Sequence, residues 1–346
     1  MARTSSFNVK GIAQKTGVST ATVSRVINNH PGVNEAIRGK ILKLLKEESS
    51  GSARSGKPVK VLTVVEIDRP LVEGFLSGVL ASIAQYTLEH PIGIELCFLP
   101  QEQKNVNFLK MLRDKRCEAV IGIFLGERSM QQMNLLSKQE IPAMLVGEKA
   151  DDPLVGHVMV DSYQGASCAV DYLASLGHKR VGFLANDITR SQALRLRLEG
   201  YKASVIKNGL EQDERLVVHH HPTRNTYEAG YLQTKELLAT VPEVTAIFAS
   251  TDEMAYGAMR ACRDLNRTVP GDISIVGFDD YPGSSYCLPA LTTVSSSLSD
   301  VGFEAVKYLD QYVNGLSSSL PKIELEGVLV KRESCQVCPA SVSTHL

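Results

Sequence analysis

The stretch GVSTATVSRVINN, residues 17–29, decides how the front of this 346-residue chain folds. Gly17 can adopt the left-handed backbone that a tight turn between two helices requires. Ser19 is expected to cap the next helix, because its hydroxyl can accept a hydrogen bond from a free amide of the first turn. The apolar residues that follow lie at helical spacing: Val23, Val26 and Ile27. The stretch therefore predicts a turn followed by a short amphipathic helix.

Apolar repeats on both sides of this stretch predict two more short helices. One precedes the turn over residues 9–13, and the other covers residues 37–45 with Asn34 as its cap. Residues 1–48 thus form a three-helix head that contains a helix-turn-helix. Apolar spacing alone does not separate a head that reads DNA from a plain three-helix cap.

The charge of the chain is unevenly distributed. The net charge is −1, but residues 1–60 carry 11 Lys or Arg against three acidic residues, which gives +8 there and −9 in the rest. A basic head on an acidic body suits a protein whose head meets a polyanion while its body stays away from it. In the second helix, short hydroxyl side chains are followed one turn later by Arg25, as expected of a helix in the major groove.

The composition changes after the head. Residues 49–58, SSGSARSGKP, are rich in Ser and Gly and predict a linker. Beyond it, short apolar runs alternate with longer helical segments, which predicts an α/β body of parallel sheets flanked by helices, large enough for two lobes. In such sheets ligands bind at the carboxyl ends of the strands. The apolar runs lie at residues 59–65, 93–99, 118–124, 142–147, 180–185, 245–250 and 273–278.

Other features of the sequence indicate where the protein resides and which kinds of site it lacks. The start lacks the apolar core of a signal peptide, and no run approaches the ~20 apolar residues of a membrane span, so we expect a cytoplasmic protein without membrane contact. Seven scattered cysteines fit a reducing compartment. The CxxC at Cys335 and Cys338 and the histidines at 219–221 are weak metal signals, so we expect no metal and no cofactor. Hydrolase and phosphate-loop motifs do not occur, and no catalytic residue is expected.

Motifs along nearly the whole chain resemble the LacI/GalR family of bacterial transcriptional regulators. The head segment VKGIAQKTGVSTATVSRVINN is similar to the family's helix-turn-helix, and six later stretches follow the family's order. The resemblance implies a body like that of type I periplasmic sugar-binding proteins. It implies a first lobe of about 59–160 and 292–320, a second lobe of about 161–291 and 321–334, and a tail of 335–346. The later stretches are LGHKRVGFLA (176–185), RLRLEGY (195–201), TDEMAYGAMRA (251–261), VPGDISIVGFDD (269–280), PALTTV (289–294) and LVKRES (329–334).

For the head, the resemblance implies which side chains meet DNA. Thr20 and Ala21 occupy the main base-reading positions, although alanine offers only an apolar surface. Thr22 and Arg25 are expected to add base and phosphate contacts. This agrees with their chemistry, because arginine can bind guanine and threonine can contact a thymine methyl group. The phosphate anchors are expected to be Ser24, Asn28 and the amide near Ser19.

For the body, the resemblance implies an effector site between the lobes. Arg197 and Asp279 match the family's effector-binding arginine and aspartate, and such a pair on opposite sides of a sugar can bind its vicinal hydroxyls. Asp68 and Asp161 are second candidates, with an equal chance of being cap or turn residues.

The effector site departs from the family at two positions. Thr251 stands where many sugar-responsive members have asparagine, and Asn225 replaces an aromatic residue that often stacks on the ligand. Tyr227 lies close enough in sequence to substitute for that ring. Stacking on a sugar face requires a ring, so the class of sugar remains open.

The linker departs furthest from the family. It is about six residues shorter by alignment and keeps only Ala53 and Arg54 of the family's hinge helix, without the leucine that enters the minor groove. Glycine disfavours a helix by up to ~1 kcal/mol, and without an apolar wedge nothing offsets the unstacking cost of a few kcal/mol. We therefore expect residues 49–57 to remain a tether, DNA to be bent little, and Arg54 to be the minor-groove contact.

The residues and the resemblance together predict a ligand-responsive transcriptional regulator, a repressor of a catabolic operon. A homodimer, or a higher oligomer, is expected to bind palindromic double-stranded DNA, with a sugar or sugar derivative as effector. A small-molecule carrier without a DNA role is the alternative, against which the basic head argues. An enzyme on a doubly wound fold is the third possibility, and no motif supports it.

Overall fold

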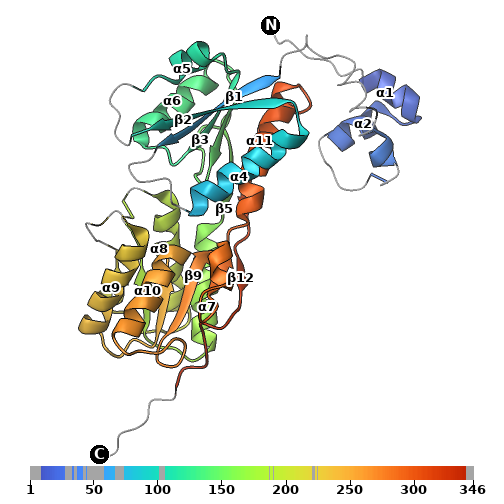
Figure 1. Cartoon of the computed structure of the whole chain (residues 1–346). Helices are drawn as coiled ribbons and strands as arrows, with labels where there is room; N and C mark the ends of the chain where they lie inside the picture. Colours follow the sequence, from blue (N-terminus) through green and yellow to red (C-terminus); the bar gives the residue numbers. More distant parts are fainter. Residues whose placement is uncertain are drawn as a thin grey trace, which may run out of the picture.

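In a computed structural model of the chain, a small helical head precedes a body of two α/β lobes that lie end to end (Figure 1). The head confirms the expected helix-turn-helix: α1 (Val9–Thr16) and α2 (Thr20–Ile27) are joined by a turn in which Gly17 has a φ of +71°. Residues 37–41 are helical as well. The structure describes residues 9–27, 33–34, 37–41, 44, 58–66, 74–100, 106–186, 188–189, 191–219, 223 and 225–339.

Local polar contacts and a small core hold the head together. The Ser19 hydroxyl accepts a hydrogen bond from the Thr22 amide (3.1 Å), so Ser19 caps α2 as predicted. The Asn34 carbonyl accepts a hydrogen bond from the amide of Arg38 (2.8 Å) at the start of the third helical segment. Burial of one face of each helix supplies most of the stability of such short helices. The buried apolar residues are Ile12, Ala13, Val23, Val26 and Ile41.

The first lobe contains a parallel sheet with the strand order β11-β5-β4-β3-β1-β2. Its strands are nearly continuous apolar runs, as expected where helices cover both faces. In Figure 1, α5 and α6 lie on one face, and α4 and α11 lie on the other. The strands are β1 (Val59–Glu66), β2 (Ile92–Leu99), β3 (Ala119–Ile123), β4 (Ala143–Val146), β5 (Gly156–Val160) and β11 (Lys322–Leu325). The helices are α4 (Gly74–Glu89), α5 (Phe108–Lys115), α6 (Glu127–Ser137) and α11 (Leu298–Val313).

The second lobe repeats this plan with the order β12-β10-β9-β8-β6-β7, in which only the β10–β12 pair is antiparallel among the described strands. Its short helical turns are η1 (Glu214–Leu216) and η2 (Pro282–Ser285). The strands are β6 (Val181–Leu184), β7 (Val217–Val218), β8 (Ala246–Ala249), β9 (Ser274–Asp279), β10 (Thr292–Ser295) and β12 (Val328–Val330). The helices are α7 (Ser162–Ser175), α8 (Gln192–Lys207), α9 (Thr226–Thr240) and α10 (Asp252–Asp264).

The division of the chain between the lobes differs from the expected one at two places. Strand β10, placed in the first lobe from the sequence, pairs with β9 in the second sheet. Strand β11, placed in the second lobe, pairs with β5 in the first sheet. Both are four-residue strands that mix polar and apolar side chains, TTVS and KIEL, and only their pairing partners decide which sheet they join.

In the described part of the chain, three connections cross between the lobes: after β5, after β10 and after β11. The chain leaves β5 at its carboxyl end directly into α7 of the other lobe, and leaves β10 at its carboxyl end into α11. Because each sheet is almost wholly parallel, the carboxyl ends of both sheets face the opposite lobe. This is the edge at which parallel sheets bind ligands. Among the described helices, none has the length and apolarity that would let it cross a membrane.

Candidate functional site: an interlobe cleft and a DNA-reading helix

A buried ion pair lies at the carboxyl ends of β8 and β9. Arg197 of α8 is 6% exposed and Asp279 at the end of β9 is 3% exposed, with 3.1 Å between Arg197 Nη2 and Asp279 Oδ1. The guanidinium also donates to the Ser250 carbonyl and lies 3.6 Å above the ring centroid of Phe278. The two groups contact each other, whereas the sequence analysis placed them on opposite sides of a ligand. The buried Nε of Arg197 has no hydrogen-bond partner among the described residues, so it can donate to a ligand oxygen.

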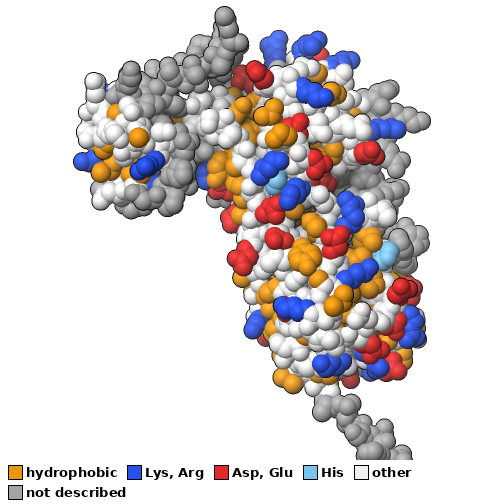
Figure 2. Space-filling view, turned by 180° about the vertical axis from the view of Figure 1, so that it is seen from behind, with side chains coloured by type: hydrophobic (Ala, Val, Ile, Leu, Met, Phe, Trp, Pro, Cys, Tyr) orange, Lys and Arg blue, Asp and Glu red, His pale blue; other side chains and the backbone are white. Residues whose placement is uncertain are grey.

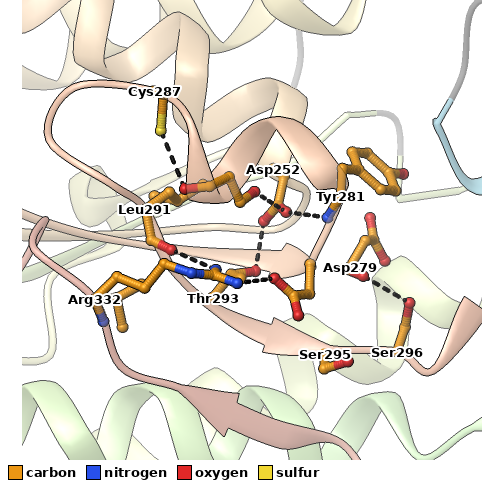
Figure 3. Close-up of polar contacts among 12 residues, drawn as sticks. Asp252, Asp279, Tyr281, Cys287, Leu291, Thr293, Ser295, Ser296 and Arg332 are labelled. Carbon is orange, nitrogen blue, oxygen red and sulfur yellow. Dashed lines mark hydrogen bonds and ion pairs between the residues drawn. The ribbon is translucent and has the colours of Figure 1, made fainter.

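A second buried carboxylate, Asp252 at the start of α10, fixes the loop that follows Asp279. It accepts hydrogen bonds from the Tyr281 amide (2.8 Å), the Ser284 hydroxyl (2.5 Å) and the Thr293 hydroxyl (2.5 Å), as Figure 3 shows for Tyr281 and Thr293. Burial, and the charge of Asp279, raise the pKa of Asp252 to about 7. This network ties the start of α10 to β10 and η2 at the carboxyl edge of the second sheet.

A neighbouring ion pair holds the next residue of the same loop. Arg332 Nη2 lies 2.6 Å from Asp280 Oδ1, and its Nη1 donates to the Leu291 carbonyl at 2.8 Å (Figure 3). The Ser296 hydroxyl donates to the Asp279 carbonyl at 3.1 Å, next to the connection between β10 and α11. The loop is therefore held on both sides by charged or hydroxyl groups of the second lobe.

The facing edge of the first lobe carries carboxylates and aromatic rings. Glu66, the last residue of β1, is 2% exposed and accepts a hydrogen bond from the Gly126 amide. Burial and the charge of Glu66 raise the pKa of Glu148 to about 7, while Arg195 of the second lobe acts in the opposite direction. The rings of Phe75 and Phe124 lie 5.3 Å apart between centroids, with Phe124 directly after β3. This edge thus offers aromatic ring surface beside the buried Glu66 and the half-buried Glu148.

Three of the predicted effector residues cap helices. Asp161 accepts from the Gln164 amide (2.9 Å), Asn225 from the Glu228 amide (3.2 Å) and Thr251 from the Met254 amide (3.3 Å). Each side chain satisfies a free amide of the first turn, which is the ordinary role of these residue types. Contact with an effector remains a prediction for all three.

Of the last two predicted effector residues, the structure describes Tyr227 but not Asp68. Tyr227 is 44% exposed, and its ring stacks on Tyr256 with 6.1 Å between centroids. Asp68 lies outside the described residues. Sequence reasoning missed Glu66, although an acidic residue that ends an apolar strand at a carboxyl edge is a usable signal. It also missed Asp252, because one acidic residue at a helix start does not reveal the partners that β10 and η2 supply.

In the head, the predicted DNA-reading side chains share the exposed side of α2. Thr20, Ala21, Ser24 and Arg25 are exposed and Thr22 is half-buried, with its hydroxyl 3.0 Å from the Ser19 hydroxyl. Asn28 and Arg54 lie outside the described residues. On the face of the body shown in Figure 2, Lys and Arg side chains alternate with Asp and Glu side chains. This agrees with the sequence, in which residues 1–60 carry a net charge of +8 and the rest −9.

A helix-turn-helix in front of a two-lobed body with a polar interlobe cleft defines a DNA-binding transcriptional regulator. Comparison with known proteins agrees: residues 8–49 match the family described as bacterial regulatory proteins, lacI family, and residues 170–335 match a periplasmic binding protein-like domain. The chain is 30% identical to the HTH-type transcriptional regulator MalR of Clostridium butyricum, over 95% of this chain and 99% of that protein. The chain belongs to the lacI family of bacterial regulatory proteins.

Two further comparisons support this assignment. The catabolite control protein A of Priestia megaterium is 28% identical, over 88% of this chain and 91% of its own length. A solved complex of the transcriptional regulator CelR with cellobiose is 27% identical and superposes with a TM-score of 0.71 over 95% of this chain and all of that chain. Within the part of the chain that the structure describes, no group of three or more His, Cys, Asp or Glu side chains is arranged to hold a metal ion.

Proposed function

We propose that this regulator is a cytoplasmic repressor of a catabolic operon and that a small carbohydrate bound between its lobes changes its affinity for DNA. The observation that carries the proposal is the buried Arg197–Asp279 pair with its unpartnered Nε at the carboxyl edge of the second sheet. Buried charged groups at such an edge favour a ligand with several hydroxyl groups, which supply both donors and acceptors. The cellobiose complex of CelR supports the same class of ligand.

We propose that the first lobe supplies the aromatic ring that the site lacks at position 225. Asn225 replaces the family's usual stacking residue, but Phe75 and Phe124 offer ring faces on the opposite side of the cleft. A sugar ring between these rings and the Arg197–Asp279 pair would meet an apolar and a polar surface at once. Effector residues proposed on this basis are Arg197 and Asp279, with Asp68, Asp161, Asn225, Tyr227 and Thr251 as the remaining candidates.

We propose that α2 enters the major groove. Arg25, Thr20 and Ala21 are exposed on it and suit base contacts, while Ser24 and the capped start of the helix suit phosphate contacts. One head makes too few phosphate contacts for useful affinity at physiological salt, so two heads are needed on a palindrome.

A homodimer would supply the two heads. Exposed apolar side chains are available for it on both lobes: Leu88 (87% exposed), Leu96 (40%) and Phe98 (40%) on the first, and Tyr286 (85%) and Leu288 (90%) on the second. Such groups favour burial against a second copy. Leu288→Asp is expected to shift sedimentation toward the monomer and to weaken operator binding. Leu154→Asp is the control, because it changes an exposed leucine outside these groups and is expected to alter neither property. A dimer that survives Leu288→Asp unchanged would contradict this surface.

The decisive experiment measures operator binding with and without candidate sugars at a stated salt concentration. Arg197→Ala is expected to cost about 2–5 kcal/mol of effector affinity while leaving binding to effector-free operator largely intact. Arg260→Ala, at an exposed arginine paired with Asp264, is the matched control. If Arg197→Ala responds to the native effector like the wild type, the cleft assignment is wrong.

The linker prediction falls on residues 49–57, which lie outside the described residues. We propose that they act as a tether and that operator DNA is bent little, because the sequence lacks an apolar wedge. A circular-permutation bending assay is expected to show no sharp central kink. A kink that disappears when residues 52–55 are deleted would overturn this part of the proposal.

A further inference from the structure

The last turn of α5 in the first lobe carries exposed basic side chains. Lys110, Arg113 and Arg116 are exposed, and among the described residues none of the three side chains has an ion-pair partner. Lys110 and Arg113 lie three residues apart and so share one face of the helix. By contrast, the exposed Arg260 of the second lobe is paired with Asp264. The positive charge at the end of α5 is therefore available to a partner.

This end of α5 lies where the body begins. A helix that joins two parallel strands runs antiparallel to them, so α5 ends at the amino edge of its sheet, opposite the cleft. Figure 1 shows α5 on the side of the first lobe that points away from the second lobe. The ammonium groups of Lys60 and Lys115 bind the same Glu95 carboxylate, at 2.9 and 2.6 Å. Because Lys60 is the second residue of β1, the chain that follows the head enters the body beside the last turn of α5.

Arg116 has a backbone conformation that favours glycine. It follows the last residue of α5 with a φ of +56° and a ψ of +44°, and its amide donates to the carbonyls of Leu112 and Arg113. Glycine is usual at this position of a helix end, because the left-handed region is strained for residues with a Cβ atom. Here the position carries a long, exposed cation. The backbone therefore does not account for the choice of arginine.

The charge of this end differs from that of the rest of the body. Residues 110–118 carry four basic and two acidic side chains, which gives +2, whereas residues 61–346 as a whole carry −9. Figure 2 shows Lys and Arg side chains at this end of the body. DNA repels an acidic body unless the end that faces the DNA is basic. The linker of residues 49–58 spans at most about 35 Å even when fully extended, so it keeps this end close to the DNA that the head binds.

We propose that the outer end of the first lobe is a second DNA-contact surface, with Arg113 and Arg116 bound to phosphates that flank the half-site read by α2. A guanidinium group can bind a phosphate through two parallel hydrogen bonds, and Lys110 adds a point charge. Phosphate contacts carry no sequence information, so this surface adds affinity and orients the body without reading bases. The inference rests on the proposed position of α2 and is independent of the effector site.

The test measures the affinity of the full chain, without effector, for two duplexes at several salt concentrations. Both contain a palindrome that the wild type selects from random duplexes, and the longer one continues about 10 base pairs beyond it on each side. The wild type is expected to bind the longer duplex about tenfold more tightly at low salt. The double variant Arg113→Ala/Arg116→Gly is expected to lose this advantage. Its slope of log affinity against log salt is expected to fall by about 1 for each lost phosphate contact.

Three controls separate this surface from folding and from the head. Glycine relieves the left-handed backbone at position 116, so the double variant is expected to melt near the wild-type temperature. Arg128→Ala is the matched control, because Arg128 is exposed on α6 at the opposite edge of the same sheet, and it is expected to bind both duplexes like the wild type. Arg25→Ala is expected to weaken binding to both duplexes alike, and its failure to do so would contradict the position of α2 alone.

Two results would overturn the second surface. The first is a wild type that binds both duplexes equally well. The second is a double variant that keeps the wild-type affinity for the longer duplex, or that loses affinity equally for both, because its side chains would then contact no flanking phosphate.

Discussion

The two lobes share a sheet plan but differ in how their cleft edges are held together. In the second lobe, Asp252 has three hydrogen-bond donors and Asp279 has an arginine. In the first lobe, Glu66 accepts a hydrogen bond from the Gly126 amide, and its charge together with burial raises the pKa of Glu148 to about 7, much as Asp279 and burial do for Asp252 in the second lobe. A carboxylate that accepts from three donors keeps its geometry when a ligand leaves, whereas a carboxylate with one donor among the described residues retains capacity to accept from a new partner. The comparison indicates a preformed second lobe and a more adaptable first lobe.

The largest expected effect breaks the pairing in the second lobe. Asp279→Ala leaves the buried Arg197 guanidinium without its carboxylate, and we expect the free energy of unfolding to fall by about 3–5 kcal/mol in urea titrations. Asp264→Ala breaks a solvent-exposed pair with Arg260 and is expected to leave the free energy of unfolding nearly unchanged. Equal effects of the two variants would contradict the comparison.

A smaller effect is expected from Glu148 of the first lobe, and it depends on pH. The pKa of Glu148 is about 7 in the folded protein, above its ordinary value of 4.5, so the folded state keeps a proton that the unfolded chain loses as pH rises between these values. Its contribution to stability is therefore lost over that window. Glu148→Gln cannot ionise, and we expect it to be more stable than the wild type by about 2 kcal/mol at pH ~8 but not at pH ~4. If the stability difference between Glu148→Gln and the wild type is the same at pH ~8 and pH ~4, the ionisation of Glu148 does not cause it.

A third variant removes one donor from the Asp252 network. Thr293→Val keeps the shape of the side chain but deletes the hydroxyl 2.5 Å from Asp252 Oδ1. We expect unfolding to become easier by about 1.5 kcal/mol, because the donor serves a buried carboxylate. Calorimetry or urea titration at neutral pH would measure it, and an unchanged midpoint would show that the network is not fully paired.

The smallest expected effect is a stabilisation, like that of Glu148→Gln, and also lies in the first lobe. Thr63 of β1 is fully buried, and among the described residues its hydroxyl has no hydrogen-bond partner. Thr63→Val is expected to stabilise the protein by up to about 1 kcal/mol, because it removes an unsatisfied polar group at nearly constant volume. Destabilisation by this variant would mean that the hydroxyl has an unseen partner such as water.

Local signals made the head and most strands predictable. Gly17 and Ser19 act through their immediate neighbours, so the turn and the cap of α2 follow from the sequence alone. The apolar runs correspond to the central strands for the same reason, as with 59–65 for β1. The lobe assignment of β10 and β11 depends on distant partners and was therefore wrong. The hydrogen bond from the Gly74 amide to the Glu253 carboxylate joins positions 179 residues apart, which no local pattern indicates.

The three connections between the lobes restrict how the molecule can move. Two of them lie against each other, since the Asp161 amide donates to the Leu325 carbonyl at 2.8 Å. Hinges between lobes are a few loop or element-terminal residues that absorb the change in backbone angles, so these connections are the expected place of bending. If the proposed effector acts by bending the chain here, substitutions in these connections are expected to change the response to every effector alike, whereas substitutions at Arg197 or Asp279 change it for particular ligands.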